Sequence, residues 1–163
     1  MELFQISIVA AMTDEIEPTD ALRRAGLRVT ASRVAVLSAL GEGEHMAADQ
    51  VAQRARDRIG TISTQAVYDV LGALARAGLV RRVEPAGSPA RYETRVDDNH
   101  HHVVCRSCGA ITDIDCVVGE PPCLLPADAA GFVIDEAEVT FWGVCPACQT
   151  ASKSDQKERV PDD

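Results

Sequence analysis

The chain has 163 residues, of which 46% are hydrophobic and 25% charged, as in a soluble globular protein of one domain or two small ones. No apolar run approaches the roughly 20 residues that span a bilayer, so we expect no contact with the membrane. The net charge of −9 argues against nucleic-acid binding only as an average, because residues 20–92 hold 11 arginines against 7 acidic residues. Only this N-terminal part is suited to phosphate groups.

Both ends of the chain predict disordered extensions. Residues 1–17 start with an apolar run that lacks the basic residues of a signal peptide. Residues 150–163 are polar and charged. Six cysteines without a secretion signal favour a cytoplasmic protein, in which paired thiols are more often metal ligands than disulfides.

Residues 18–94 predict a winged helix-turn-helix domain. Thr30 and Ser63 stand at N-cap positions, and Gly78 follows the longest apolar stripe of helical spacing. Two short β-rich runs then flank a Pro/Gly turn and predict a hairpin, the wing. A helical bundle with a stray hairpin is the alternative, but it leaves the arginine excess unexplained. The predicted helices lie near residues 19–25, 31–40, 47–56 and 64–77, and the hairpin strands near 79–83 and 90–94.

The pattern changes after a polar stretch at residues 95–99, which we interpret as a hinge. Residues 100–149 then predict a small domain of short strands. The fold class is therefore α+β, with an N-terminal winged helix-turn-helix followed by a small α/β dimerisation domain that holds a four-cysteine zinc site. Its strands are expected near residues 100–105, 110–115 and 133–142, and a short helix near 126–130.

Two C-x2-C pairs, separated by 36 residues, carry the strongest chemical signal. Zinc takes four soft or borderline ligands in a tetrahedron, and two such turns supply four thiolates. No coordination position stays open, so the site is structural rather than catalytic. Two redox dithiols or two disulfides are the alternative. The four predicted ligands are Cys105, Cys108, Cys145 and Cys148.

Three consecutive histidines precede the first pair. In a strand, His100 and His102 point to one face and His101 to the other. Glu93 and Asp113 can reach the same place as His100 and His102, whereas His45 alone would be an ordinary loop histidine. Mixed His and carboxylate ligands suit Fe(II), Mn(II), Co(II) or Zn(II). The alternative is a solvated polar strand.

Two cysteines, Cys116 and Cys123, lie outside the C-x2-C pairs. Buried, inert thiols are one interpretation, and a redox role is the other.

The fourth helix is predicted to enter the major groove of DNA. Tyr68 can lie against a thymine methyl group, and Arg28 can bind phosphate or the minor groove. The first turns of that helix carry the other expected DNA contacts, Ser63, Thr64 and Gln65.

These segments together resemble the ferric uptake regulator (Fur) family, over about residues 19–148. The resemblance is carried by AGLRVTASRVAVL, TQAVYDVLGALARAGLV, RYE, NHHHVVCRSCG and CPAC. Several C-terminal segments look most like the actinobacterial FurA/CatR-type branch, which represses catalase or catalase-peroxidase genes and usually its own gene.

The resemblance implies a structural zinc site on the four paired cysteines and a homodimer on operator DNA. It also implies a regulatory site for Fe(II) or Mn(II), formed by His45, Glu93, His100 and His102. Asp113 stands where peroxide sensors have Asp and iron sensors Glu. The expected function is a metal-dependent, peroxide-responsive repressor that binds an inverted repeat; the alternative is an iron or zinc uptake regulator without peroxide sensing.

The sequence departs from the family pattern in two places. Asp69 follows the recognition tyrosine where an Arg is common, so the operator can differ. Asn99 and Ala137 replace ligands of a third metal site found in some members, and we expect that site to be absent.

Two other classes fit less well. A zinc deaminase would need an H-x-E motif, which the chain lacks. A zinc-ribbon adaptor that binds only protein leaves the basic N-terminal part unexplained. We therefore expect no enzymatic activity.

Overall fold

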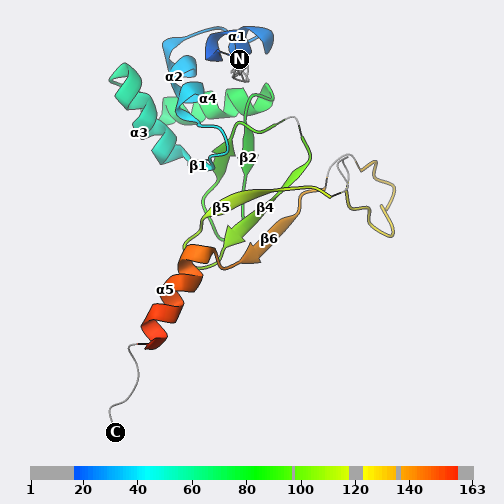
Figure 1. Cartoon of the computed structure of the whole chain (residues 1–163). Helices are drawn as coiled ribbons and strands as arrows, with labels where there is room; N and C mark the ends of the chain where they lie inside the picture. The colour runs from blue at the N-terminus through cyan, green and yellow to red at the C-terminus, as the bar shows by residue number, and fades with distance from the viewer. Residues whose placement is uncertain (1–16, 97, 118–122, 135–136, 158–163) are drawn as a thin grey trace, which may run out of the picture.

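The computed structural model describes residues 17–96, 98–117, 123–134 and 137–157, with side chains described as far as residue 151. Four helices gather at one end of the molecule, a first sheet lies beneath them, and a second sheet follows (Figure 1). The expected extension over residues 1–17 lies outside the described residues, except for Glu17. The predicted α+β class, with an N-terminal winged helix, is confirmed.

The helices begin where capping side chains can satisfy their free N–H groups. The Thr30 hydroxyl accepts from the N–H of Arg33 at 3.3 Å, and the Ser63 hydroxyl accepts from that of Ala66 at 3.1 Å. Gly60 ends the third helix in the left-handed region, at a φ of +83°, three residues later than the sequence predicted. The helices are α1 (Pro18–Arg24), α2 (Ala31–Ala39), α3 (Ala48–Ile59) and α4 (Thr64–Arg76).

The first sheet is the wing plus one strand that the sequence did not predict. Strand β1 (Met46–Ala47) pairs antiparallel with β3 (Arg91–Glu93), and β3 pairs with β2 (Arg81–Val83). Two residues are too short for a period-2 pattern, so the sequence placed Ala47 in the following helix. Strand β1 matters because it anchors the loop that carries His45 beside the end of β3.

The second sheet has the order β5-β4-β6. Strand β4 (His100–Cys105) is central, with β5 (Ile111–Asp115) antiparallel to it and β6 (Thr140–Gly143) parallel. The third strand was predicted from residue 133 but begins at Thr140. Residues 126–130, which the structure describes in full, do not form the expected helix. Ala130 and Gly131 both take positive φ values, of 48° and 83°, which end any helical turn.

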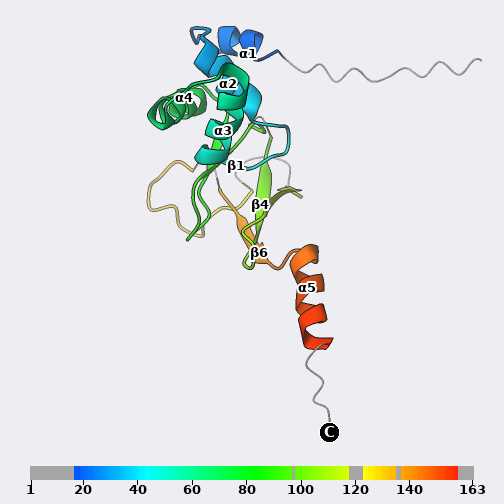
Figure 2. The same ribbon diagram turned by 90° about the vertical axis from the view of Figure 1, so that its left-hand side faces the viewer.

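The last helix corrects the predicted tail. Helix α5 (Pro146–Lys157) continues through residues 150–157, which the sequence analysis expected to be disordered, and projects away from both sheets (Figure 2). Pro146 starts it with a pre-set φ, and the side-chain amide of Gln149 donates to the carbonyl of Val144 at 2.6 Å. Residues 158–163 lie outside the described part. None of the described helices is long and apolar enough to cross a membrane.

Candidate metal centres and nucleic-acid interface

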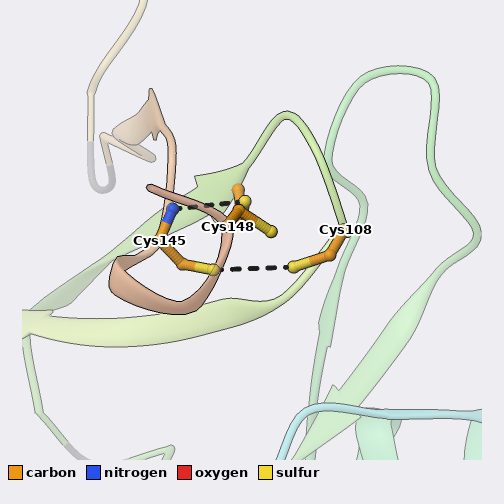
Figure 3. A group of neighbouring side chains, drawn as sticks. Cys108, Cys145 and Cys148 are labelled. Carbon is orange, nitrogen blue, oxygen red and sulfur yellow. Dashed lines mark hydrogen bonds between the residues drawn. The ribbon is translucent and has the colours of Figure 1, made fainter. Parts of the chain in front are cut away.

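Four cysteine side chains meet where the second sheet joins α5. Cys105 ends β4, and Cys108 lies in the turn that follows. Cys145 directly precedes α5, and Cys148 lies in its first turn (Figure 3). All four sulfur atoms lie within 4.8 Å of one another, and those of Cys108 and Cys145 are 3.7 Å apart. Two thiolates bound tetrahedrally to one zinc ion at about 2.3 Å would be about 3.8 Å apart. The cluster fits a structural zinc site.

Backbone N–H groups prepare part of this cluster for a cation. The N–H of Cys145 donates to the sulfur of Cys105 at 3.3 Å. This bond and the N–H of Cys108 lower the pKa of Cys105 to about 6. Ser107 lowers the pKa of Cys148, but the neighbouring Cys145 and Cys108 thiols outweigh it, so the pKa rises to about 11. One thiolate therefore forms readily at neutral pH, whereas the crowded set needs positive charge to ionise fully.

A second cluster lies between the two sheets and is built from both. His45 comes from the loop before β1, and Glu93 ends the wing strand β3. His102 lies on β4, directly opposite Asp113 on β5. One ligand atom from each of these four residues lies within 4.8 Å of the others. His100 lies beside them, with its Nε2 atom 3.3 Å from Glu93 Oε1 and 3.9 Å from Asp113 Oδ1.

The cluster is almost fully removed from solvent. The side chains of Glu93, His100 and His102 are at most 1% exposed, that of His45 is 4% and that of Asp113 is 14%. Burial raises the pKa of Glu93, but contacts with the His102 and His45 imidazoles outweigh it and hold the pKa at about 2. Glu93 is therefore a buried anion that depends on positively polarised neighbours, such as these imidazoles or a metal ion.

Glu93 pairs with His100 and His102 at 3.3 and 3.4 Å, but other buried polar atoms of the cluster lack a hydrogen-bond partner. His45 Nε2 lies 2.8 Å from Glu93 Oε2 and 2.8 Å from Asp113 Oδ1, but it makes no hydrogen bond with good geometry to either. Asp113 Oδ1 also lacks a hydrogen-bond partner among the described residues. Buried polar groups are almost always paired. Donor atoms that approach a common point without pairing fit a divalent metal ion with nitrogen and oxygen ligands.

A supporting layer around this cluster was missed by the sequence analysis, which assigned residues 95–99 only to a hinge. Asp98 Oδ1 lies 2.8 Å from His100 Nδ1, so it can fix the orientation of the imidazole. Arg95 pairs with Asp98, donates to Asp115 at 2.6 Å, and lies 3.6 Å from Asp113. The sequence did contain a signal for it. Asp98 stands two positions before His100, and the two-residue repeat of a strand places both side chains on the same face.

The remaining histidine of the triplet lies apart from this cluster. His101 Nε2 is 3.3 Å from the sulfur of Cys123, and Cys116 lies in the same group. Burial and the neighbouring Cys116 thiol raise the pKa of Cys123, although Asn99 lowers it. The structure thus brings together the two cysteines outside the C-x2-C pairs, and adds a histidine that the sequence analysis did not connect with them.

The expected DNA-contacting side chains lie on the exposed start of α4 or before α2. Tyr68 is 50% exposed, the largest exposed apolar side chain described in the helical domain. Arg28 is exposed as well. The Gln65 amide donates to Asp69 at 2.9 Å, so this carboxylate is engaged within its own helix. Thr64 accepts from Arg56 at 3.2 Å, and Ser63 is occupied as the cap of α4.

Comparison with known proteins gives one consistent result. Residues 24–139 match the model of the ferric uptake regulator family. Ferric uptake regulation protein 1 of Mycolicibacterium fortuitum is 59% identical over 131 residues, which cover 80% of this chain and 81% of that protein. The transcriptional regulator FurA of Mycobacterium tuberculosis is 56% identical over 133 residues, 82% of this chain and 90% of FurA.

Solved structures and more distant relatives agree. The ferric uptake regulator of Pseudomonas aeruginosa with manganese has a TM-score of 0.57 and 28% identity, covering 79% of this chain and 98% of its own. The peroxide operon regulator of Bacillus subtilis is 27% identical over 133 residues, covering 81% of this chain and 91% of the relative.

Proposed function

We propose that this chain, which belongs to the ferric uptake regulator family, is a cytoplasmic repressor that binds an inverted-repeat operator as a metal-dependent homodimer. Members of the family are metal-responsive transcriptional regulators and not enzymes. The observation that carries the proposal is the buried His and carboxylate cluster, because its donors come from the wing of one domain and the sheet of the other.

The winged-helix domain is the DNA-binding part of the proposed repressor. Tyr68 and Arg28 are exposed, and residues 20–92 hold the arginine excess of the chain. Asp69, held by Gln65, can accept a hydrogen bond from a cytosine amino group instead of binding phosphate. Arginine contacts with phosphate imply an affinity that falls steeply as salt concentration rises.

The C-terminal domain is the dimerisation part. Every exposed large hydrophobic side chain among the described residues, except Tyr68, belongs to this domain. Such a concentration of apolar surface marks a protein interface, and two copies of a chain most often meet about a twofold axis. An inverted-repeat operator then follows from that symmetry. The exposed side chains are Ile114, Val117, Leu124, Leu125, Phe132, Val133, Phe141 and Val144.

Two metals have separate roles in this proposal. Zinc on the four paired cysteines is structural, and it stays bound whether or not the regulatory site holds metal. Fe(II) or Mn(II) is held by His45, Glu93, His100, His102 and Asp113 and fixes the angle between the two domains. That angle sets the distance between the two recognition helices of a dimer. Metal thereby shifts a population of domain arrangements by its differential affinity for the DNA-competent one.

Metal-dependent operator binding tests the proposal directly. Duplexes selected from a random pool in the presence of Mn(II) should contain an inverted repeat. Binding should be lost with a chelator that leaves the cysteine-bound zinc in place. His100→Ala should keep zinc and the dimer but lose the dependence on Mn(II). The proposal fails if the wild type binds the selected duplex equally well with and without Mn(II).

The finer proposal is that peroxide relieves repression, with a catalase-peroxidase gene and the chain's own gene as targets. The imidazoles of His45, His100 and His102 surround the place where iron would lie, and bound iron supplies the reactivity toward peroxide. Asp113, the residue typical of peroxide sensors in this family, supports this assignment. The finer targets rest on the resemblance to the actinobacterial branch.

One experiment separates the possible signals. Protein loaded with Fe(II) or with Mn(II) is treated with peroxide, and operator release and its rescue by thiol reductant are followed. Release with iron only, without rescue, supports histidine oxidation at the cluster. Release with either metal, reversed by reductant, supports a thiol switch. If neither form releases DNA, the chain is an iron or zinc uptake regulator without peroxide sensing.

A further inference from the structure

One cluster of metal-binding side chains takes no part in the proposed function. His101, Cys116 and Cys123 each offer one ligand atom, and these atoms lie within 4.8 Å of one another. Both cysteines are partly buried. None of the three belongs to the paired cysteines or to the cluster between the domains.

Two of the three side chains are held in place by the second sheet. His101 lies on the central strand β4, opposite Ile114 of β5, and is 8% exposed. Cys116 directly follows β5, and its N–H donates to the carbonyl of Asn99 at 3.3 Å. The sheet register therefore fixes the positions of His101 and Cys116 relative to each other. Cys123 comes from a later segment of the chain.

The distances suit one shared ion. The Nε2 atom of His101 lies 3.3 Å from the sulfur of Cys123. An imidazole nitrogen at about 2.0 Å and a thiolate at about 2.3 Å from a tetrahedral zinc ion would lie about 3.5 Å apart. A disulfide between Cys116 and Cys123 would not need a buried imidazole against one of its sulfur atoms.

Unused hydrogen-bonding capacity surrounds the same place. Asn99 Nδ2 is buried and makes no hydrogen bond of good geometry among the described residues. Unpaired buried polar atoms in a native fold point to a missing partner. Asn99 can donate to a metal-bound thiolate and so support the ligand.

We propose that His101, Cys116 and Cys123 form a further metal site for zinc or a similarly thiophilic divalent cation. Two thiolates balance the charge of the dication, and the neutral imidazole adds a third ligand. Three protein ligands leave one tetrahedral position for water or another small ligand. Thiolate ligands distinguish this site from the nitrogen and oxygen cluster, because soft ligands select zinc over Mn(II) and Fe(II).

Neither Asn99 nor Ala137, the positions that led us to expect no third metal site, is a ligand of the proposed site. The ligands instead come from the second residue of β4 and from two cysteines of the segment that leaves β5. A cation bound there would attach Cys123 and the residues that follow to the central strand. The proposal is independent of DNA binding and of the metal clamp.

Cobalt spectroscopy of the full chain tests the proposal. Reduced protein that retains its cysteine-bound zinc is titrated with Co(II) without oxygen. Thiolate-to-cobalt charge transfer in the near ultraviolet should then appear, with zinc content unchanged after desalting. The cluster between the domains contains no thiolate, so it contributes only the weaker visible bands. Cobalt that replaced the paired-cysteine zinc would show itself as released zinc.

Three variants assign the signal. Cys123→Ser and His101→Ala should each weaken Co(II) binding at the thiolate site by at least tenfold while retaining one zinc. His100→Ala is the matched control, since it removes a ligand of the other cluster and should leave the charge-transfer band intact. The proposal is overturned if the wild type shows no thiolate band without zinc release, or if the band is unchanged in Cys123→Ser.

Discussion

The two domains of this chain are stabilised in different ways. Among the described residues, all buried apolar side chains except Val104 and Cys105 belong to the winged-helix domain. Leu22, Val36 and Leu71 there are fully buried. The C-terminal domain instead buries three histidines on its central strand and exposes its large apolar side chains. A hydrophobic core stabilises the first domain, whereas the stability of the second domain depends on bound metal and on a second copy of the chain.

This difference shows how a small chain can combine a stable DNA-binding domain with a response to metal. A domain with its own core can keep its recognition helix intact whatever the metal supply. A domain without one gains much of its folding free energy from bound metal. The buried His and carboxylate cluster joins the two domains, and in the proposed function metal bound there changes their relative placement while each fold stays in place.

The largest expected effect is the loss of the paired-cysteine zinc. Cys108→Ser removes one of four ligands, and a structural zinc site contributes on the order of 10 kcal/mol. The C-terminal domain should unfold or become monomeric while the helical domain keeps its far-ultraviolet signal. Metal analysis, sedimentation and circular dichroism check this. Cys116→Ser, the same change at a cysteine outside the two C-x2-C pairs, should retain this zinc; a folded, zinc-free dimer of Cys108→Ser would remove the contrast between the domains.

A cavity in the helical core should act only on the first domain. Leu71 is fully buried on α4, so Leu71→Ala should lower the free energy of unfolding of that domain by about 2–5 kcal/mol. Zinc content and dimerisation should not change. Leu125→Ala should leave the free energy of unfolding of the helical domain unchanged, because this side chain is 75% exposed and lies in the other domain. Coupled loss of zinc in Leu71→Ala would show that the domains are not separately stabilised.

The exposed tyrosine should affect DNA binding without affecting either fold. Tyr68→Ala should weaken operator binding, because it removes apolar contact with a base edge. We expect a loss on the order of that for one mismatched base pair, about 1–3 kcal/mol. Tyr68→Phe keeps the ring and should retain most of the affinity. Fluorescence anisotropy at constant salt measures both. Equal affinity for wild type and Tyr68→Ala would place the recognition surface elsewhere.

Acid should release zinc from the C-terminal domain with a defined onset. Cys105 has a pKa of about 6 and is a thiolate at neutral pH, so protons compete for it only below that value. Below a pH of about 6, zinc must displace one more proton than it does at neutral pH. The zinc affinity should therefore fall about tenfold more steeply for each pH unit below 6 than it does above 6. Chelator competition from pH 5 to 8 measures the slope. A slope that is constant across that range would contradict the assigned role of Cys105.

Much of this organisation was predictable from the sequence, and the failures have physical causes. Thr30 and Ser63 cap their helices because hydroxyl capping is a local effect. His100 and His102 share a face because strand alternation is regular. The burial of His45 depends on β1 pairing with β3, a non-local contact that no periodicity shows. Likewise, the sequence could not show that Cys123 lies against His101, because the two are 22 positions apart and no periodicity connects them.

The most direct test of the central claim is the linkage between metal and DNA. If metal in the cluster sets the DNA-competent arrangement, operator DNA must raise Mn(II) affinity by the same factor by which Mn(II) raises operator affinity. Free Mn(II) can be followed by electron paramagnetic resonance in titrations with and without the operator. For the wild type, we predict that each ligand raises the affinity for the other by the same factor of at least ten. For His100→Ala, we predict no increase in either affinity. A Mn(II) affinity that does not change when the operator is added would contradict the account.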